Sequence, residues 1–188
     1  MKEKKYCIDV FTDVKKSWMN PYSPVRVSSP TGSYYTLKGN KTDRKKIIRE
    51  CARRNIRTRS YETRWARDTS YRSMFLKNTS PPYYCRYCGE KISPSQMQVD
   101  HIVPVAAVKK SLYARWLLER QGITNVNDIR NLAPSCRRCN RRKGTKMGIW
   151  LLRAHLGKNQ NWFRTRRILR AVIGAILLLG VLYLFFVL

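Results

Sequence analysis

Four of the six cysteines form two CxxC pairs, a spacing that suits the thiolate ligands of a metal ion. The pairs are Cys85 with Cys88 and Cys136 with Cys139, whereas Cys7 and Cys51 have no such spacing. Disulfides are the alternative use of paired cysteines. The N-terminus lacks the apolar stretch of a signal peptide, however, so nothing in it argues for export to an oxidising compartment. The pattern therefore favours one closed, structural zinc site.

Polar residues of a different kind lie between and beside the cysteine pairs. Asp100 directly precedes His101, Asn131 lies further along, and Asn140 comes immediately after the last cysteine. A carboxylate and an amide oxygen suit Mg²⁺ that is bound together with water and a phosphate. Because adjacent residues of a strand point to opposite faces, Asp100 could reach such an ion while His101 approaches a phosphate from the other side. This arrangement requires a turn that brings Asn140 opposite Asp100.

Short elements are expected to position these residues. A strand over residues 98–105 carries the Asp-His pair, and a second strand over 129–133 leads to the second cysteine pair, where a helical piece starts. Between the strands, the pattern predicts a helix over 108–121. Its predicted buried side chains are Leu112, Trp116 and Leu117.

The N-terminal part is expected to contain two strands and one basic helix. The strands are predicted at residues 6–10 and 33–37. Between Lys38 and Arg59, apolar residues recur at helical spacing among many basic ones, with Thr42 or Asp43 available as a cap. This helix is either a solvated charged helix or an arm that follows a phosphate backbone.

The charge of the chain limits the classes of partner. Its 188 residues contain 39 Lys and Arg against 11 Asp and Glu, which gives a formal net charge of +28. Such a surface favours a polyanion as the partner. The length allows about one domain with extensions and excludes a doubly wound α/β enzyme with a second substrate domain.

An uncharged run extends from Ala171 to Leu188. As a helix with a rise of about 1.5 Å per residue it would span roughly 27 Å, close to the thickness of a bilayer's hydrocarbon core. A buried core helix is the alternative, but the run has no polar face and lies at the end of the sequence. Arginines flank only its N-terminal side, which predicts a single-pass tail anchor with the rest of the chain in the cytoplasm. These arginines are Arg164, Arg166, Arg167 and Arg170.

The central segment, residues 85–146, resembles the HNH endonucleases, which have a ββα-metal fold. The resemblance rests on the strings CRYCG, VDHIVPV, RNLAPSC and CRRCNRRKG. It implies that His101 is the general base that activates water and that Asp100 and Asn140 bind the catalytic divalent ion. Asn131 resembles the residue whose hydrogen bonds hold the loop and orient the histidine. Asn140 stands where the family's last histidine would be, and its oxygen favours Mg²⁺ or Mn²⁺.

The resemblance also implies a reaction and a set of residues that bind the substrate. The expected reaction is hydrolysis of DNA phosphodiester bonds to 5′-phosphate and 3′-hydroxyl products. The basic residues around the second cysteine pair are expected to bind the nucleic-acid backbone. They are Arg137, Arg138, Arg141, Arg142, Lys143 and Lys146.

The sequence as a whole predicts an α+β protein with four consecutive parts. These are a basic N-terminal extension with a helix (1–78), an HNH nuclease domain with a four-cysteine zinc site (79–157), a basic linker (158–170) and a transmembrane helix (171–188). The predicted role is a membrane-tethered nuclease of a phage, a mobile element or a defence system. Two alternatives stay open: a zinc-knuckle nucleic-acid-binding protein without catalysis, and a membrane adaptor whose basic surface binds anionic lipid.

Overall fold

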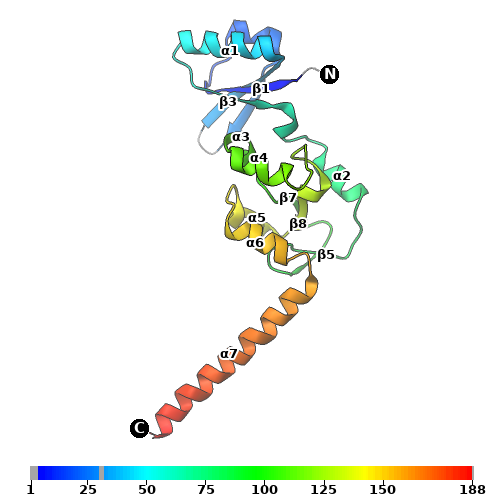
Figure 1. The fold of residues 1–188 in the computed structure, drawn as a ribbon, viewed down its shortest axis with the longest axis vertical. Coiled ribbons are helices and arrows are strands. Elements are labelled where there is room, and N and C mark those ends of the chain that lie inside the picture. The colour runs from blue at the N-terminus through cyan, green and yellow to red at the C-terminus, as the bar shows by residue number, and fades with distance from the viewer. Residues whose placement is uncertain (1–3, 30–31, 188) are drawn as a thin grey trace. The chain divides into compact units, whose positions relative to one another are not determined.

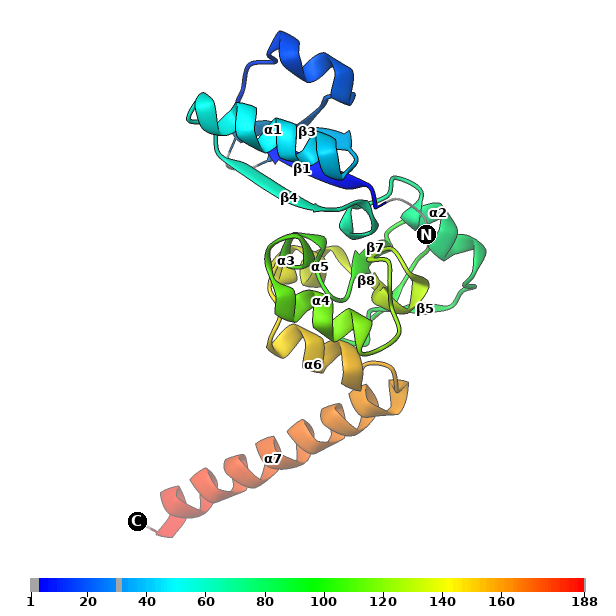
Figure 2. The same ribbon diagram turned by 45° about the horizontal axis from the view of Figure 1, so that its top comes forward.

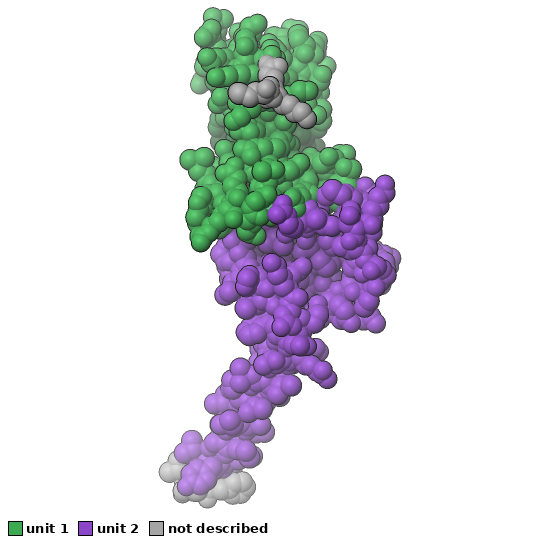
Figure 3. Space-filling model, turned by 45° about the vertical axis from the view of Figure 1, so that its right-hand side comes forward, with its two compact units in different colours: residues 1–71, 105–128 green, residues 72–104, 129–188 purple. Residues whose placement is uncertain are grey.

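The computed structural model describes residues 4–29 and 32–187, and the chain divides into two compact units (Figure 3). The first unit combines the N-terminal part up to residue 71 with residues 105–128, and the second combines 72–104 with the part from 129 onward. The chain therefore crosses between the units three times. The predicted domains, in contrast, were continuous segments with boundaries after residues 78, 157 and 170.

The first unit is built on a four-stranded antiparallel sheet with the strand order β2-β3-β1-β4. Its strands are β1 (Tyr6–Val10), β2 (Val25–Ser29), β3 (Gly32–Gly39) and β4 (Thr58–Glu62), with a 3-10 helix at Ser17–Tyr22. Helix α1 (Lys41–Arg53) covers one face of this sheet (Figure 2). Ile47 and Cys51 of α1 pack there against Ile8 and Leu37. The two strands predicted in this region and the predicted helix are confirmed.

The start of α1 differs from the prediction by a few residues. Asn40 is the cap, because its Oδ1 accepts a hydrogen bond from the Asp43 amide at 2.9 Å. The Asp43 carboxylate in turn accepts one from the Asn40 amide at 3.1 Å. Asp43 is therefore the third residue of α1 and the second partner of a capping box, and it is not the cap itself.

Residues 105–128 belong to the first unit, where α3 contacts the 3-10 helix at Thr63–Trp65. They form α3 (Val105–Lys110) and α4 (Leu112–Glu119). Lys109 of α3 lies over the Tyr61 ring, 4.4 Å from its centroid, and 4.0 Å from the fully buried carboxylate of Asp9. Arg64 pairs with Glu119 of α4 at 3.2 Å.

The predicted helix over 108–121 is interrupted at Ser111, and the prediction of its buried side was wrong. The Ser111 hydroxyl accepts from the Ala114 amide and starts α4 as a new helix, which changes the face that meets the core. Ala114 and Leu118 are buried, whereas Leu112 is 78% exposed and Trp116 is also exposed.

The second unit contains two small antiparallel strand pairs, several short helices and the long helix α7 (Figure 1). The strand pairs are β5 (Tyr83–Tyr84) with β6 (Lys91–Ile92) and β7 (Gln98–His101) with β8 (Leu132–Ser135). The helices are α2 (Tyr71–Lys77), which begins at the unit boundary, a 3-10 helix at Ile129–Asn131, α5 (Arg137–Lys143), α6 (Ile149–Leu156) and α7 (Gln160–Val187). Helices and strands alternate irregularly, so the chain is a mixed α+β protein.

Helix α7 begins within the segment that was predicted to be a linker. It runs without interruption through the basic residues into the apolar run, and its Phe163 side chain is buried. Residues 160–185 form a helix that is long and apolar enough to cross a membrane, and none of its most apolar stretch is buried by the described residues. The last residue of the predicted transmembrane segment, Leu188, lies outside the described residues.

Candidate metal centre and active site

The four cysteines of the CxxC pairs come together in the second unit. Their sulfur atoms all lie within 4.8 Å of one another, and Cys88 Sγ and Cys136 Sγ are 3.9 Å apart. Sulfurs around a tetrahedral zinc ion lie about 3.8 Å apart, because each Zn–S bond is about 2.3 Å long. The donor set and its spacing therefore fit a zinc ion, as the sequence predicted.

Backbone contacts hold the two cysteine turns against each other. The Arg86 amide donates to the Pro134 carbonyl at 2.9 Å, and the Gly89 amide donates to the Cys85 carbonyl at 2.8 Å. Gly89 has a φ of +76°, a conformation that glycine adopts without strain. Hydrogen bonds with the Cys139 and Cys85 thiols lower the pKa of Cys88, and hydrogen bonds with Cys85 and Cys88 raise the pKa of Cys139, because the thiols share protons within one cluster.

The strand pair β7–β8 positions the Asp-His pair beside this cluster. His101 is opposite Leu132 and Gln98 is opposite Ser135. Asn131, at the end of the 3-10 helix that precedes β8, holds the segment after His101. Its Oδ1 accepts from the Val103 amide at 2.8 Å, and its carbonyl accepts from the Ile102 amide at 2.7 Å. Asn131 therefore holds the backbone of the two residues that follow His101.

The Asp100 carboxylate is held by two side chains that both contact its Oδ2 atom. The Lys143 ammonium lies 2.8 Å from this oxygen, and the Tyr87 hydroxyl donates to it at 2.5 Å. Burial and the negative charge of Asp100 raise the pKa of Tyr87, so its hydroxyl stays protonated and remains a donor. Because both contacts use Oδ2, Oδ1 is the oxygen that a divalent cation could take.

Asn140 meets the same face of β7 as Lys143 does. Its Nδ2 donates to Gln98 Oε1 at 2.6 Å. Gln98 and Asp100 are two residues apart on β7 and share one face, while Asn140 and Lys143 are three residues apart on α5 and share one side. One side of α5 therefore packs against one face of β7. The amide nitrogen of Asn140 is used in this contact, so its carbonyl oxygen is the atom available as a ligand.

His101 lies on the opposite face of β7 from Asp100, as the strand alternation predicted. Its side chain is only 2% exposed, and its backbone carbonyl accepts a hydrogen bond from Lys143 Nζ at 2.7 Å. Lys143 therefore contacts both residues of the Asp-His pair.

The structure differs from the sequence prediction at Lys143. This residue was expected to grip the nucleic-acid backbone, but its ammonium is fully buried against Asp100 and His101 and is therefore not available to a phosphate. The other five predicted backbone-binding residues are exposed or partly exposed. They are Arg137, Arg138, Arg141, Arg142 and Lys146.

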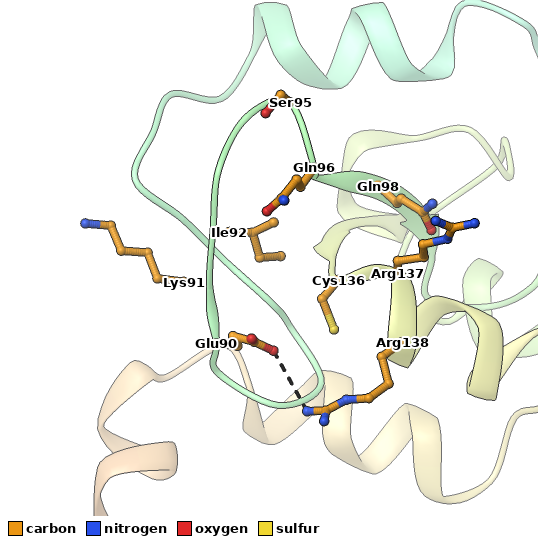
Figure 4. A pocket seen from close by; sticks show the side chains of 9 residues that line it. All are labelled: Glu90, Lys91, Ile92, Ser95, Gln96, Gln98, Cys136, Arg137 and Arg138. Carbon is orange, nitrogen blue, oxygen red and sulfur yellow. Dashed lines mark ion pairs between the residues drawn. The ribbon is translucent and has the colours of Figure 1, made fainter.

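A pocket of about 660 Å³ opens beside the cysteine cluster (Figure 4). Arg137 and Arg138 line it from the start of α5, and Gln96 and Gln98 line it from the chain around β7. Arg138 is 3.9 Å from the exposed Glu90 carboxylate. The cations and amides of this pocket can contact phosphate oxygens and base edges.

Sequence reasoning missed two residues of the site, Tyr87 and Gln98. A signal existed for Gln98, because it stands two residues before Asp100 in a predicted strand and must share its face. For Tyr87, which lies inside the first CxxC pair, no spacing rule points to Asp100. Only the packing of the cysteine turn against β7 brings the two together.

The buried ion pair between Lys143 and Asp100 predicts a large loss of stability on removal of one partner. We expect Lys143→Met to destabilise the second unit by about 3–5 kcal/mol, because the Asp100 carboxylate loses its internal cation. Lys146→Met is the matched control, since Lys146 is exposed and its loss should change stability by about 0.5 kcal/mol or less. Denaturant unfolding of the three proteins measures both effects. Equal midpoints for Lys143→Met and the parent would contradict the role of the pair.

Comparison with known proteins finds one partial similarity to an endonuclease. The chain is 40% identical over 67 residues to the CRISPR-associated endonuclease Cas9 of Corynebacterium diphtheriae. The aligned residues are 35% of this chain but only 5% of that protein. No protein-family model and no solved structure matches the chain. The chain therefore spans only a small part of the length of the protein that it matches.

Proposed function

We propose that this protein is a metal-dependent HNH endonuclease that hydrolyses DNA. The observation that carries the proposal is the β7–β8–α5 arrangement beside the four-cysteine cluster. It combines Asp100 and His101 on β7 with Asn140 on the facing side of α5, and Asn131 holds the adjoining loop. Two strands and a helix that present these residues agree with a ββα-metal fold, and the partial similarity to Cas9 points to the same class of enzyme.

In the proposed mechanism, neutral His101 accepts a proton from the water that attacks the phosphorus. Asp100 Oδ1 and Asn140 Oδ1 would hold Mg²⁺ or Mn²⁺, which supplies charge neutralisation at the phosphoryl oxygens and at the leaving 3′-oxygen. Tyr87 and Lys143 fix the orientation of the Asp100 carboxylate, and Gln98 fixes that of Asn140. The exposed arginines of α5 would hold the DNA backbone, with binding that weakens as salt increases.

The zinc cluster has a structural role in this proposal. Four thiolates complete the tetrahedron around a zinc ion, so no position is left for water or substrate. The cluster instead joins the turn after β5 to the start of α5, which carries Asn140.

We further propose that α7 tethers the nuclease to a membrane with the catalytic unit in the cytoplasm. Its apolar part has no covering within the described protein, and its basic residues all precede the apolar run. Under the positive-inside rule, this side faces the cytoplasm.

A second candidate function, nucleic-acid binding without catalysis, is favoured by two observations. Lys143 already balances the charge of Asp100, and His101 is nearly inaccessible to solvent. The exposed arginines and the zinc cluster would serve such a protein equally well. Only a catalytic assay separates the two functions.

The deciding experiment is plasmid cleavage by the full chain in detergent, with and without Mg²⁺. We expect nicked or linear products only with the divalent ion. The full chain is needed because a truncation after residue 160 would remove Phe163, which is buried in the second unit. If the protein binds the plasmid but does not cleave it with either Mg²⁺ or Mn²⁺, the nuclease proposal is wrong and nucleic-acid binding without catalysis is the function.

The proposed metal ligands predict a change in metal response. Asp100→Ala and Asn140→Ala should each shift the Mg²⁺ concentration for half-maximal cleavage upward, by about tenfold or more if one ligand contributes at least 1.4 kcal/mol. Circular dichroism accompanies the titration of Asp100→Ala, because this change also removes the buried ion-pair partner of Lys143. Asp13→Ala is the control, because this exposed acid lies in the first unit. Titration curves that coincide for the parent and both ligand variants would refute the assignment.

A further inference from the structure

Helix α7 is attached to the second unit by close packing and not by a free linker. The Phe163 ring, 5% exposed, occupies the space that a side chain on Gly89 would need: a Cβ atom there would lie 2.3 Å from the ring. A Cβ atom on Gly157 would lie 1.9 Å from the Arg86 carbonyl oxygen. Both contacts are made with the first cysteine turn. The start of α7 is therefore fixed against the zinc cluster.

Helix α6 lies beside the start of α7 in both ribbon views (Figures 1 and 2). It buries Trp150 and Ala154, and the Trp150 and Tyr87 rings form a T-shaped pair with 5.4 Å between their centroids. Its other side carries two large apolar residues three positions apart, Ile149 and Leu152, which are 56% and 51% exposed. No contact within the described protein accounts for these exposed side chains, so α6 has an apolar face without a partner.

The same region is strongly cationic. No acidic residue follows Asp128 in the sequence. At the turn between α6 and α7, the surface has a hollow of about 450 Å³ lined in part by Leu156, Lys158 and Trp162. Four further arginines follow on the first turns of α7: Arg164, Arg166, Arg167 and Arg170. We call Ile149, Leu152, Lys158, Trp162 and these arginines the junction surface.

We propose that the junction surface binds an anionic phospholipid bilayer and holds the second unit directly on the headgroup layer. This inference rests on the proposed membrane tether. Exposed aliphatic residues and a tryptophan beside cations are typical of protein segments at the interface between headgroups and acyl chains. Anionic headgroups complement the cations, and the acyl region accepts Ile149 and Leu152. A nucleic acid would offer phosphates but would leave these apolar side chains without an apolar partner.

Because the start of α7 is packed against the second unit, membrane binding also affects how the nuclease is oriented. Because Phe163 packs on Gly89, the bilayer that holds α7 also limits the orientation of the cysteine cluster. The catalytic unit should therefore face DNA with a restricted orientation close to the membrane, and it should not move freely on a long tether.

The proposal is tested with the full chain reconstituted in lipid nanodiscs. A cysteine for an environment-sensitive dye is introduced at Leu152→Cys and, as the matched control, at Leu112→Cys, an exposed leucine on α4 outside the junction surface. The labelled parent provides the background from the native cysteines. We expect aqueous iodide to quench the dye at position 152 several-fold less in discs with phosphatidylglycerol than in discs of phosphatidylcholine alone. The dye at position 112 should remain equally accessible in both.

Two outcomes would overturn the proposal. One is equal iodide access at positions 152 and 112 in the anionic discs. The other is that a short DNA duplex in detergent protects the dye at position 152 from iodide, whereas anionic lipid does not. That result would make the junction surface a nucleic-acid site. Carbonate extraction tests the tether separately, and plasmid cleavage in the same discs tests the nuclease separately.

Discussion

Changing His101 to alanine is expected to abolish cleavage while DNA affinity and metal content remain close to those of the parent. A general base acts on the transition state, and its loss typically lowers a rate by about 10²- to 10⁴-fold. The measurement is single-turnover plasmid cleavage at saturating Mg²⁺. Filter binding to the same DNA and metal analysis of the purified protein accompany it.

The buried position of His101 requires a second variant and a matched control. His101→Ala leaves a cavity in the β7–β8 pair and could lower stability, so His101→Gln, which keeps most of the volume, tests the chemistry in a folded protein. His155→Ala is the control, because this is the other histidine of the chain and it is exposed on α6. Cleavage by folded His101→Gln at the parent rate would contradict the role of the general base.

Replacing Cys85 by serine is expected to remove the bound zinc and to unfold the second unit. Zinc binding to small structural sites contributes roughly 10 kcal/mol or more, and this binding is coupled to folding. The unit has two-residue and four-residue strands and little continuous core, so few other contacts can replace the metal. Cys88→Ser, Cys136→Ser and Cys139→Ser should behave alike, because all four sulfurs belong to one cluster.

The control for this prediction is Cys51→Ser. Cys51 is buried between α1 and the sheet of the first unit, far in sequence from the CxxC pairs, so its change should leave one zinc per chain. Metal analysis and thermal unfolding measure both variants. Zinc at one equivalent and an unchanged melting temperature in Cys85→Ser would show that the four thiols do not form the site.

Local patterns in the sequence determined the chemistry of the candidate site. The CxxC spacing restricts where two sulfurs can lie, so the four-thiol cluster followed from residue types and short distances along the chain. Strand alternation likewise separated Asp100 from His101, and the structure shows them on opposite faces of β7. The apolar run after Arg170 predicted a helix long enough to cross a membrane, which the structure confirms.

Contacts between distant segments decided the rest, and local spacing contains no information about them. A row of arginines and a lysine after the second cysteine pair looks uniformly basic, yet the side of α5 that meets β7 buries Lys143 and exposes its neighbours. The assignment of residues 105–128 to the first unit depends on Lys109 meeting Asp9 and Tyr61 across the chain. The predicted linker before the apolar run is part of α7, and its Phe163 packs where a side chain on Gly89 would lie. In each case the free energy comes from burial and ion pairing between residues far apart in sequence, so only the folded arrangement could decide which side chains were available to solvent, substrate or lipid.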